Sequence, residues 1–578
     1  MRFPSFIFSA LIAFMAFAPL VHGDVTLPNI IGDRMVLQQE AVVPIWGEAD
    51  AGEKITVTLG QQKKMATADA KGRWMVRLAP LKSGGPFEMT VAGNNTLTLH
   101  DIWVGEVWVC SGQSNMTWEL LSSTGAKETI AESNDPQLHL FNIPRSTSDK
   151  TGRDVNAQWT VAAPNTTPRF SAVAYHFGAE LRKTLNVPVG LIHASRSGSP
   201  VESWTPIATM RVSDDYKLLL KTWDKMIANF PSFKKAYEQK DGKALMQVWG
   251  ETVSDYPAYK THYEDKIQAW MAAVEKARSE GKPEPRLPGP PPEPVSPDSM
   301  YCPGSLYERM IAPLQPYAMR GVIWYQGESN AAQAWSYRQL FPNLIQSWRT
   351  TWASAGSAGT GPGDSLSRPI RSGQDFPFLF VQAANFGVTT PEPVESTWAE
   401  LREAQAVSLS VPGTGIATAL DLGVGGNVHP PNKRDVGIRL ALVAKASVYG
   451  KKDIVFSGPN YDRMKIEGGT IRISFKNAGG LTVRNKTSLG VTLDGEPSPQ
   501  GFAMAGADRK WVWASAKLEG ETIVVWNEQI PKPVAVRYAW SDNPAINLYN
   551  GAGLPAMPFR TDDWELSTFG KTGIPEFD

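Results

Sequence analysis

Ser114 and His429 have the residue type and the sequence surroundings of a nucleophile and its base. Ser114 lies in Gly112-Gln-Ser-Asn-Met116, directly after an apolar run. A serine hydroxyl becomes a nucleophile when a base can take its proton, and the ordinary pKa of histidine suits that task near neutral pH. The pair therefore indicates nucleophilic catalysis through an oxyanion. For Ser114 alone, the alternative is a residue that merely caps a helix.

Of the seven histidines of the chain, His429 is the strongest candidate for the base, ahead of His193 and His176. It lies in a loop, and Pro430 and Pro431 fix the backbone directly after it, which reduces the entropy lost in holding the imidazole. His193 ends an apolar run, so it either reaches the edge of a sheet or is a satisfied histidine of the core. His176 lies within a predicted amphipathic helix, where a position on the helix face is expected.

The elements that position Ser114 are a buried strand and a tight turn. Ile102 to Val109 is almost entirely apolar and rich in valine and tryptophan, and Gly112 permits the turn after it. From Asp101 onward, strands alternate with helices: a helix at Phe170 to Asn186 and strands at Val187 to Ala194, Arg320 to Tyr325, Phe378 to Ala383 and Gly415 to Leu420. This order predicts an α/β domain whose parallel sheet has helices on both faces. Ligands bind at the carboxyl ends of such strands.

The pattern divides the chain into modules. Residues 24–101 have short alternating runs separated by turn residues and predict an N-terminal β module of sandwich type, and residues 451–578 predict a second one. The α/β domain between them spans 102–450. Residues 205–304 interrupt it with a helical and proline-rich insertion on the surface.

Composition excludes several functions. Lysine and arginine number 57, as do aspartate and glutamate, so no net charge attracts nucleic acid. No His-Glu-x-x-His or similar pair predicts a metal site. Cys110 and Cys302 are the two cysteines of the chain, and the sequence allows one disulfide bond between them without showing whether it forms.

Met1 to Gly23 has the form of a secretory signal that is cleaved before Asp24. This signal predicts a secreted or periplasmic protein. A membrane anchor is the alternative, although the apolar run is short for one.

Three motifs together resemble the sialate O-acetylesterase family of SGNH hydrolases. They are Gly112-Gln-Ser-Asn-Met116, Trp324-Tyr-Gln-Gly-Glu-Ser-Asn330 and His429-Pro-Pro-Asn-Lys433 followed by Gly437. The resemblance implies a three-layer SGNH-type fold flanked by β-sandwich modules. It also implies hydrolysis of an acetyl ester on a sugar, with O-acetylated sialic acid as the expected substrate and no cofactor.

The same resemblance implies roles for individual residues. Ser114 would be the nucleophile and His429 the base. The backbone N–H groups of Ser114 and Gly198 would bind the oxyanion, because Ser195 to Trp204 is similar to the family's Gly-Gly-Thr-Pro segment, with Ser197 in place of the first glycine. A side-chain amide would be the third donor, with Gln326 preferred and Asn330 as the alternative.

The acid of the catalytic triad is left open. Many relatives carry an aspartate two or three residues before the histidine, but here those positions hold Asn427 and Gly426. Asp421 is the nearest upstream carboxylate. Either Asp421 completes a triad, or Ser114 and His429 act as a dyad.

Substrate contacts are expected from Trp118 and Arg196. Trp118, Trp204, Trp324, Trp335 and Trp398 lie close to the motifs and could stack on sugar rings, although core packing is the more common role for each of them taken singly. Arg196 is a candidate partner for the carboxylate of a sialic acid. The alternatives are an acetylesterase for plant polysaccharides such as xylan or pectin, and a non-catalytic carbohydrate-binding protein.

Overall fold

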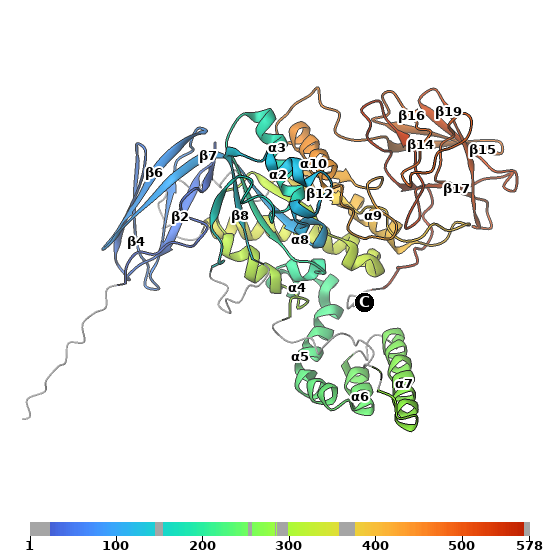
Figure 1. Ribbon diagram of the computed structural model, residues 1–578, viewed down its shortest axis with the longest axis horizontal. Coiled ribbons are helices and arrows are strands. Elements are labelled where there is room, and N and C mark those ends of the chain that lie inside the picture. Colours follow the sequence, from blue (N-terminus) through green and yellow to red (C-terminus); the bar gives the residue numbers. More distant parts are fainter. Residues whose placement is uncertain are drawn as a thin grey trace, which may run out of the picture.

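The computed structural model describes residues 23–144, 154–252, 257–283, 285, 299–357 and 376–571 (Figure 1). The predicted secretory signal lies outside these residues except for Gly23, as does most of the proline-rich part of the insertion. No helix in the described ranges combines the length and the apolar character needed to cross a lipid bilayer.

A parallel sheet forms the centre of the molecule. Its strand order is β13-β12-β11-β7-β10-β8-β9, and neighbouring strands are parallel except for β9, which is antiparallel to β8. The strands are β7 (Thr96–Gly112), β8 (Asp135–Asn142), β9 (Trp159–Ala162), β10 (Val189–Ser195), β11 (Gly321–Tyr325), β12 (Phe378–Gln382) and β13 (Thr414–Thr418). The predicted mixed α/β fold is confirmed.

The two faces of this sheet bury different cores, because successive side chains of a strand point to opposite sides. Val107 and Val109 of β7 belong to one core, and Trp108 and Cys110 belong to the other. Helices α8 (Ala334–Ser357) and α9 (Thr397–Val407) pack into the first core, and α3 (Ala172–Leu185) and α10 (Lys433–Ser447) pack into the second. Cys302 lies in the first core, so it is not bonded to Cys110.

Strand β7 connects the N-terminal strands to the central sheet. Its first half pairs with β6 (Gly84–Ala92), and its second half pairs with β10 and β11. Asp101, at the predicted module boundary, has a left-handed φ of 59°, which aspartate tolerates. The other N-terminal strands are β1 (Val36–Gln38), β2 (Val43–Glu48), β3 (Lys54–Leu59), β4 (Gln62–Thr67) and β5 (Arg73–Leu78). One continuous strand thus crosses the predicted boundary.

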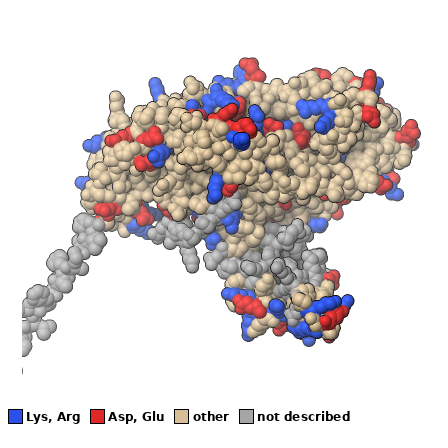
Figure 2. Space-filling view, viewed as in Figure 1, with Lys and Arg blue, Asp and Glu red and all other residues tan. Residues whose placement is uncertain are grey.

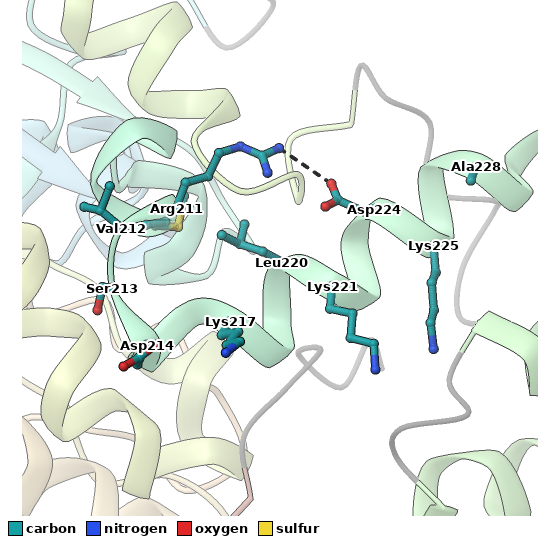
Figure 3. A pocket seen from close by; sticks show the side chains of 11 residues that line it. Arg211, Val212, Ser213, Asp214, Lys217, Leu220, Lys221, Asp224, Lys225 and Ala228 are labelled. Atoms are coloured by element: carbon teal, nitrogen blue, oxygen red, sulfur yellow. Dashed lines mark ion pairs between the residues drawn. The ribbon is translucent and has the colours of Figure 1, made fainter.

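The described part of the insertion contains four α-helices, of which α4 lies against the body of the molecule and α5, α6 and α7 extend away from it (Figure 1). The four helices are α4 (Ile207–Arg211), α5 (Lys217–Glu238), α6 (Gly242–Thr252) and α7 (Pro257–Ser279). A cavity of about 770 Å³ lies at the start of α5, where Arg211 forms an ion pair of 3.6 Å with Asp224 (Figure 3). No residue of the predicted site lines this cavity. Basic and acidic side chains are interspersed over the face shown in Figure 2.

Two four-stranded antiparallel sheets follow α10. One has the order β14-β15-β20-β19 and the other has β18-β17-β21-β23. Their strands are β14 (Asn460–Glu467), β15 (Thr470–Lys476), β17 (Phe502–Ala505), β18 (Trp511–Trp513), β19 (Ser515–Glu519), β20 (Thr522–Trp526), β21 (Ala535–Tyr538) and β23 (Phe559–Arg560). Apolar residues of both sheets, such as Ile471 and Phe502, share one core. The described residues therefore include the additional β sheets that the sequence predicts.

Candidate active site

Ser114 lies at the carboxyl end of β7, directly after a turn that requires glycine. Gly112 has a φ of 137°, and a Cβ at this position would lie 2.1 Å from the carbonyl oxygen of Tyr325. The N–H of Gln113 donates to the same oxygen at 2.9 Å, so the turn is fastened to β11. The short helix α1 (Ser114–Thr117) begins immediately, and Ser114 itself is half-buried.

His429 lies beside this turn because contacts of its neighbours join the two segments. Asn115 Nδ2 donates to the carbonyl oxygen of Val428 at 3.1 Å. The ring of Trp118 stacks on the His429 imidazole, with centroids 5.4 Å apart and planes inclined by 24°. The structure therefore brings together two segments of the chain that are far apart in sequence.

The surroundings of His429 favour the neutral imidazole. Burial lowers the pKa of His429, and the positive charge of Lys433 lowers it further. A base must be neutral before it can accept a proton. The imidazole of the half-buried His429 therefore stays neutral, and able to accept a proton, to a lower pH than an ordinary histidine.

Asp421 is engaged elsewhere. Its two carboxylate oxygens accept hydrogen bonds of 2.6 and 2.9 Å from the guanidinium of Arg439, and the hydroxyl of Tyr549 donates to it at 3.2 Å. The backbone N–H of His429 donates to Asn427 Oδ1 at 2.9 Å. Within the described ranges, no carboxylate is hydrogen-bonded to the His429 imidazole. The structure thus pairs Asp421 with arginine and does not bring it to the histidine.

Gly198 lies on the loop that runs beside the Ser114 turn. Strand β10 ends with Ser195 paired to Gly112, and the N–H of Arg196 donates to the carbonyl oxygen of Gly112 at 3.0 Å. Gly198 is exposed and has a left-handed φ of 73°. This loop is therefore anchored to the residue that forms the serine turn.

Gln326 and Asn330 support the same loop from within the core. Gln326 Nε2 donates to the carbonyl oxygen of Ser199 at 3.2 Å and to Asn330 Oδ1 at 2.8 Å. Asn330 Oδ1 also accepts from the N–H of Val201 at 3.0 Å, and its Nδ2 donates to Glu202 Oε2 at 3.0 Å. Both side chains are buried. Because both amide hydrogens of Gln326 are already donated within the protein, the geometry favours a supporting role over the oxyanion contact that the sequence led us to expect.

His193 is a satisfied histidine of the core. Its Nδ1 lies 2.7 Å from Asn142 Oδ1, and its Nε2 lies 2.6 Å from Ser195 Oγ. Ser195 Oγ is in turn 2.7 Å from Thr117 Oγ1 at the end of α1. This buried chain of hydrogen bonds supports the helix that begins at Ser114.

The tryptophans of the motifs have two different roles. Trp204 and Trp324 are completely buried and pack edge to face, with centroids 5.9 Å apart, so the core-packing interpretation is confirmed for both. Trp118 and Arg196 are half-buried, and both lie next to the serine turn through the contacts described above. In the described part of the chain, no cluster of three or more His, Cys, Asp or Glu side chains could hold a metal ion.

Comparisons with known proteins agree with these motifs. A family profile described as carbohydrate esterase, sialic acid-specific acetylesterase, matches residues 104–282. Sialate O-acetylesterases of Mus musculus and Rattus norvegicus are 27% and 29% identical, and each alignment covers 92% of this chain and 93% of the relative. The fold is also similar to the crystal structure of a carbohydrate acetylesterase from Xanthomonas citri, with a TM-score of 0.70 and 32% sequence identity. This match covers 94% of this chain and 100% of the Xanthomonas citri chain.

The chain belongs to the sialate O-acetylesterase family. It is a carboxylic-ester hydrolase, and its activity is carbohydrate O-acetylester hydrolysis. The family predicted from the three motifs is thereby confirmed, and the non-catalytic alternative is set aside.

A buried polar cluster in this esterase was not predicted from the sequence. Lys433 Nζ donates to Asn115 Oδ1 at 2.5 Å, and Asn115 Nδ2 donates to Glu328 Oε1 at 2.6 Å. Lys433 is completely buried, although lysine is among the residues least often buried. A signal was present in the sequence, because Lys433 begins a helix, where the helix dipole disfavours a cation.

Burial shifts both charged members of the cluster toward their neutral forms. It lowers the pKa of Lys433 to about 7, against the opposing effect of the Glu328 carboxylate. It also raises the pKa of Glu328, whose Oε2 is buried and has no hydrogen-bond partner among the described residues. Such shifts are typical of functional sites, and both residues contact Asn115, which directly follows Ser114.

Proposed function

We propose that this esterase hydrolyses acetyl esters on sugars by nucleophilic attack of Ser114, with His429 as the base and no triad carboxylate. The observation that carries the proposal is the pair of contacts that joins the two segments, namely the Asn115–Val428 hydrogen bond and the stacking of Trp118 on His429. The pairing of Asp421 with Arg439 supports a dyad. Helices on both faces of the parallel sheet support a three-layer fold of SGNH type.

The proposed reaction has two halves. Ser114 Oγ attacks the acetyl carbonyl carbon while His429 takes the hydroxyl proton, and the oxyanion is stabilised by the N–H groups of Ser114 and Gly198. Collapse of this intermediate breaks the ester bond, and the imidazolium returns the proton to the leaving sugar hydroxyl. Water then attacks the acetyl-enzyme in the same manner and releases acetate, which regenerates the Ser114 hydroxyl.

Replacement of the nucleophile tests this proposal. We expect Ser114→Ala to lower kcat for acetate release from an activated acetyl ester by about 10⁴-fold or more, since the attacking oxygen is lost. The matched control is Ser197→Ala, which removes an exposed serine hydroxyl from the neighbouring loop and is expected to leave kcat within about threefold. Undiminished turnover by Ser114→Ala would reject the mechanism.

We propose O-acetylated sialic acid as the substrate. The mammalian relatives are named for it, and Arg196 lies beside the serine turn, where a guanidinium could bind the sialic acid carboxylate. The Xanthomonas citri relative is named only as a carbohydrate acetylesterase, which keeps acetylated plant oligosaccharides as a second candidate. Acetate release from both substrates, measured side by side, decides between them. If sialic acid is bound as proposed, Arg196→Ala raises KM for the sialate and leaves KM for a neutral sugar ester unchanged.

We also propose that the protein is exported. The proposal rests on the signal-like sequence of Met1 to Gly23. Mass spectrometry of the protein recovered from the periplasm or the medium is expected to show Asp24 as its first residue. Recovery of the uncleaved chain from the cytoplasm alone would reject it.

A further inference from the structure

We propose that Lys433 is a positioning residue of the esterase reaction: through Asn115 it holds the Ser114 turn against the His429 loop. The inference rests on the proposed roles of Ser114 and His429. Nothing in the general mechanism of a Ser-His pair requires a buried lysine, so the presence of Lys433 needs an explanation of its own.

Asn115 is the side chain through which Lys433 acts. It follows Ser114 directly, is buried, and has hydrogen bonds to three other segments of the chain. Its Nδ2 donates to Glu328 Oε1 at 2.6 Å and to the carbonyl oxygen of Val428 at 3.1 Å, which uses both amide hydrogens. Its Oδ1 accepts from Lys433 Nζ at 2.5 Å. The orientation of the amide is thereby fixed, because exchanging its oxygen and nitrogen would break all three bonds.

The ammonium group of Lys433 is held in place by aromatic faces. Nζ lies 5.5 Å from the ring centroid of Trp118 and 5.6 Å from that of Tyr325. Both distances allow cation–π attraction, which strengthens when water is excluded. Trp118 also stacks on His429, so one ring contacts both the ammonium and the imidazole. Loss of Lys433 would therefore loosen the support of the base as well as that of the serine turn.

The charge of Lys433 also acts on the proton acceptor. Among the described residues, Lys433 on α10 is the charged group whose field acts on His429, while Asn115 and Trp118 on the α1 side carry no charge. Glu328 and Tyr325 face Lys433 itself. A neighbouring cation disfavours the imidazolium, so removing it raises the pKa of His429 toward its usual value.

The test is the Lys433→Met variant, assayed with 4-nitrophenyl acetate from pH 4 to pH 9. We expect kcat to fall by about 10- to 100-fold with little change in KM, since a misplaced nucleophile slows the reaction without weakening binding. We also expect the acidic limb of the kcat/KM profile to move to higher pH. Lys445→Met is the matched control, because Lys445 is a buried lysine of the same helix that pairs with Glu180 at 2.9 Å, away from the site. It should leave the pH profile unchanged.

A double-mutant cycle identifies the path of the effect. If Lys433 acts through Asn115, then Lys433→Met costs several-fold less in kcat when Asn115→Ala is already present. Independent, multiplicative effects of the two substitutions would overturn the proposal. If Lys433→Met does not fold, the Lys433→Met/Glu328→Gln pair removes both charges of the cluster and is measured in its place.

The outcomes separate this inference from the proposed function. Full activity of Ser114→Ala would reject the proposed function itself. Loss of activity in Ser114→Ala, together with an unchanged kcat and an unchanged acidic limb in Lys433→Met, would reject only the role of Lys433. Lys433→Met could also lower the melting temperature without shifting the pH profile, which is the result expected for the control Lys445→Met. Lys433 would then be a purely structural residue, and its proposed role would be rejected.

Discussion

The carboxylate of Asp421 illustrates how neighbours decide the role of a single residue. It is almost completely buried, and both of its oxygens are bound by Arg439, whose side chain is only 11% exposed. A carboxylate in a bidentate pair with a buried guanidinium stabilises the fold. Its sequence position upstream of His429 made it a candidate for the triad, but the pair connects the segment after β13 with α10 instead.

The Asp421→Asn variant is therefore expected to lose stability more than activity. A buried arginine left without its counter-ion lowers the free energy of unfolding by about 3 kcal/mol. A dyad predicts that kcat of the folded variant stays within about tenfold of the native value, whereas a triad predicts a loss near 10³- to 10⁴-fold. Chemical denaturation measures the free energy of unfolding, and steady-state kinetics measure kcat. The control is Asp69→Asn, which breaks an exposed ion pair with Arg73 and should change neither the free energy of unfolding nor kcat.

At the scale of elements, the close packing of α3 and α10 positions the segment that carries His429 and Lys433. A Cβ on Gly437 of α10 would lie 2.7 Å from His176 Cβ and 2.7 Å from the carbonyl oxygen of Val173, both on α3. Only glycine allows this approach. His176 is consequently buried at the contact, and its Nε2 has no hydrogen-bond partner among the described residues.

This contact predicts a loss of stability in acid. Burial, reinforced by Arg434, lowers the pKa of His176 to about 4, while the unfolded chain binds the proton near the usual value of 6.5. The folded state therefore loses stability as the pH falls from about 6.5 to about 4, by up to about 3 kcal/mol. Melting temperatures of the native protein and His176→Leu across this range measure the effect. The melting temperature of His176→Leu should fall less between about pH 6.5 and about pH 4 than that of the native protein. The control is His100→Leu, at an exposed histidine, whose melting temperature should fall as much as that of the native protein.

At the scale of the whole molecule, the C-terminal segment is fastened to α9 by buried charges. Glu400 accepts hydrogen bonds from the backbone N–H groups of Ser567 and Thr568, at 2.9 and 3.0 Å, and from both of their hydroxyls. The guanidinium of Arg402 donates to the carbonyl oxygens of Ser541 and Asp542, each at 2.8 Å. Burial lowers the pKa of Arg402 to about 9. The C-terminal sheets are thus docked onto the catalytic domain.

Glu400→Ala should release this end of the chain. The substitution leaves the N–H groups of Ser567 and Thr568 without their acceptor, and we expect the free energy of unfolding to fall by about 3 kcal/mol. Limited proteolysis followed by mass spectrometry should show earlier cleavage after Arg560 than in the native protein. Glu392→Ala, at an exposed position, is the matched control. Equal cleavage of Glu400→Ala and native protein would contradict the docking role.

Much of the fold and part of the site could be predicted from local sequence. The apolar run of β7, the glycine at 112 and the two prolines after His429 each act on the backbone within a few residues, so their effect is visible without tertiary structure. The three motifs predicted the family, which is confirmed. They also contained Glu328 and Lys433, although no property of either residue alone revealed a partner.

Local sequence patterns were enough to predict the strands β7, β10, β11, β12 and β13, the position of Ser114 after its strand, and the family of the esterase, whereas β8 and β9 were not predicted. Three contacts depend on tertiary packing: Asp421 binds Arg439, Gln326 supports the Gly198 loop, and Lys433 binds Asn115. Hydrogen bonds and charges act over a few ångströms between residues that can be hundreds of positions apart. Their partners are therefore set by how the strands and helices pack.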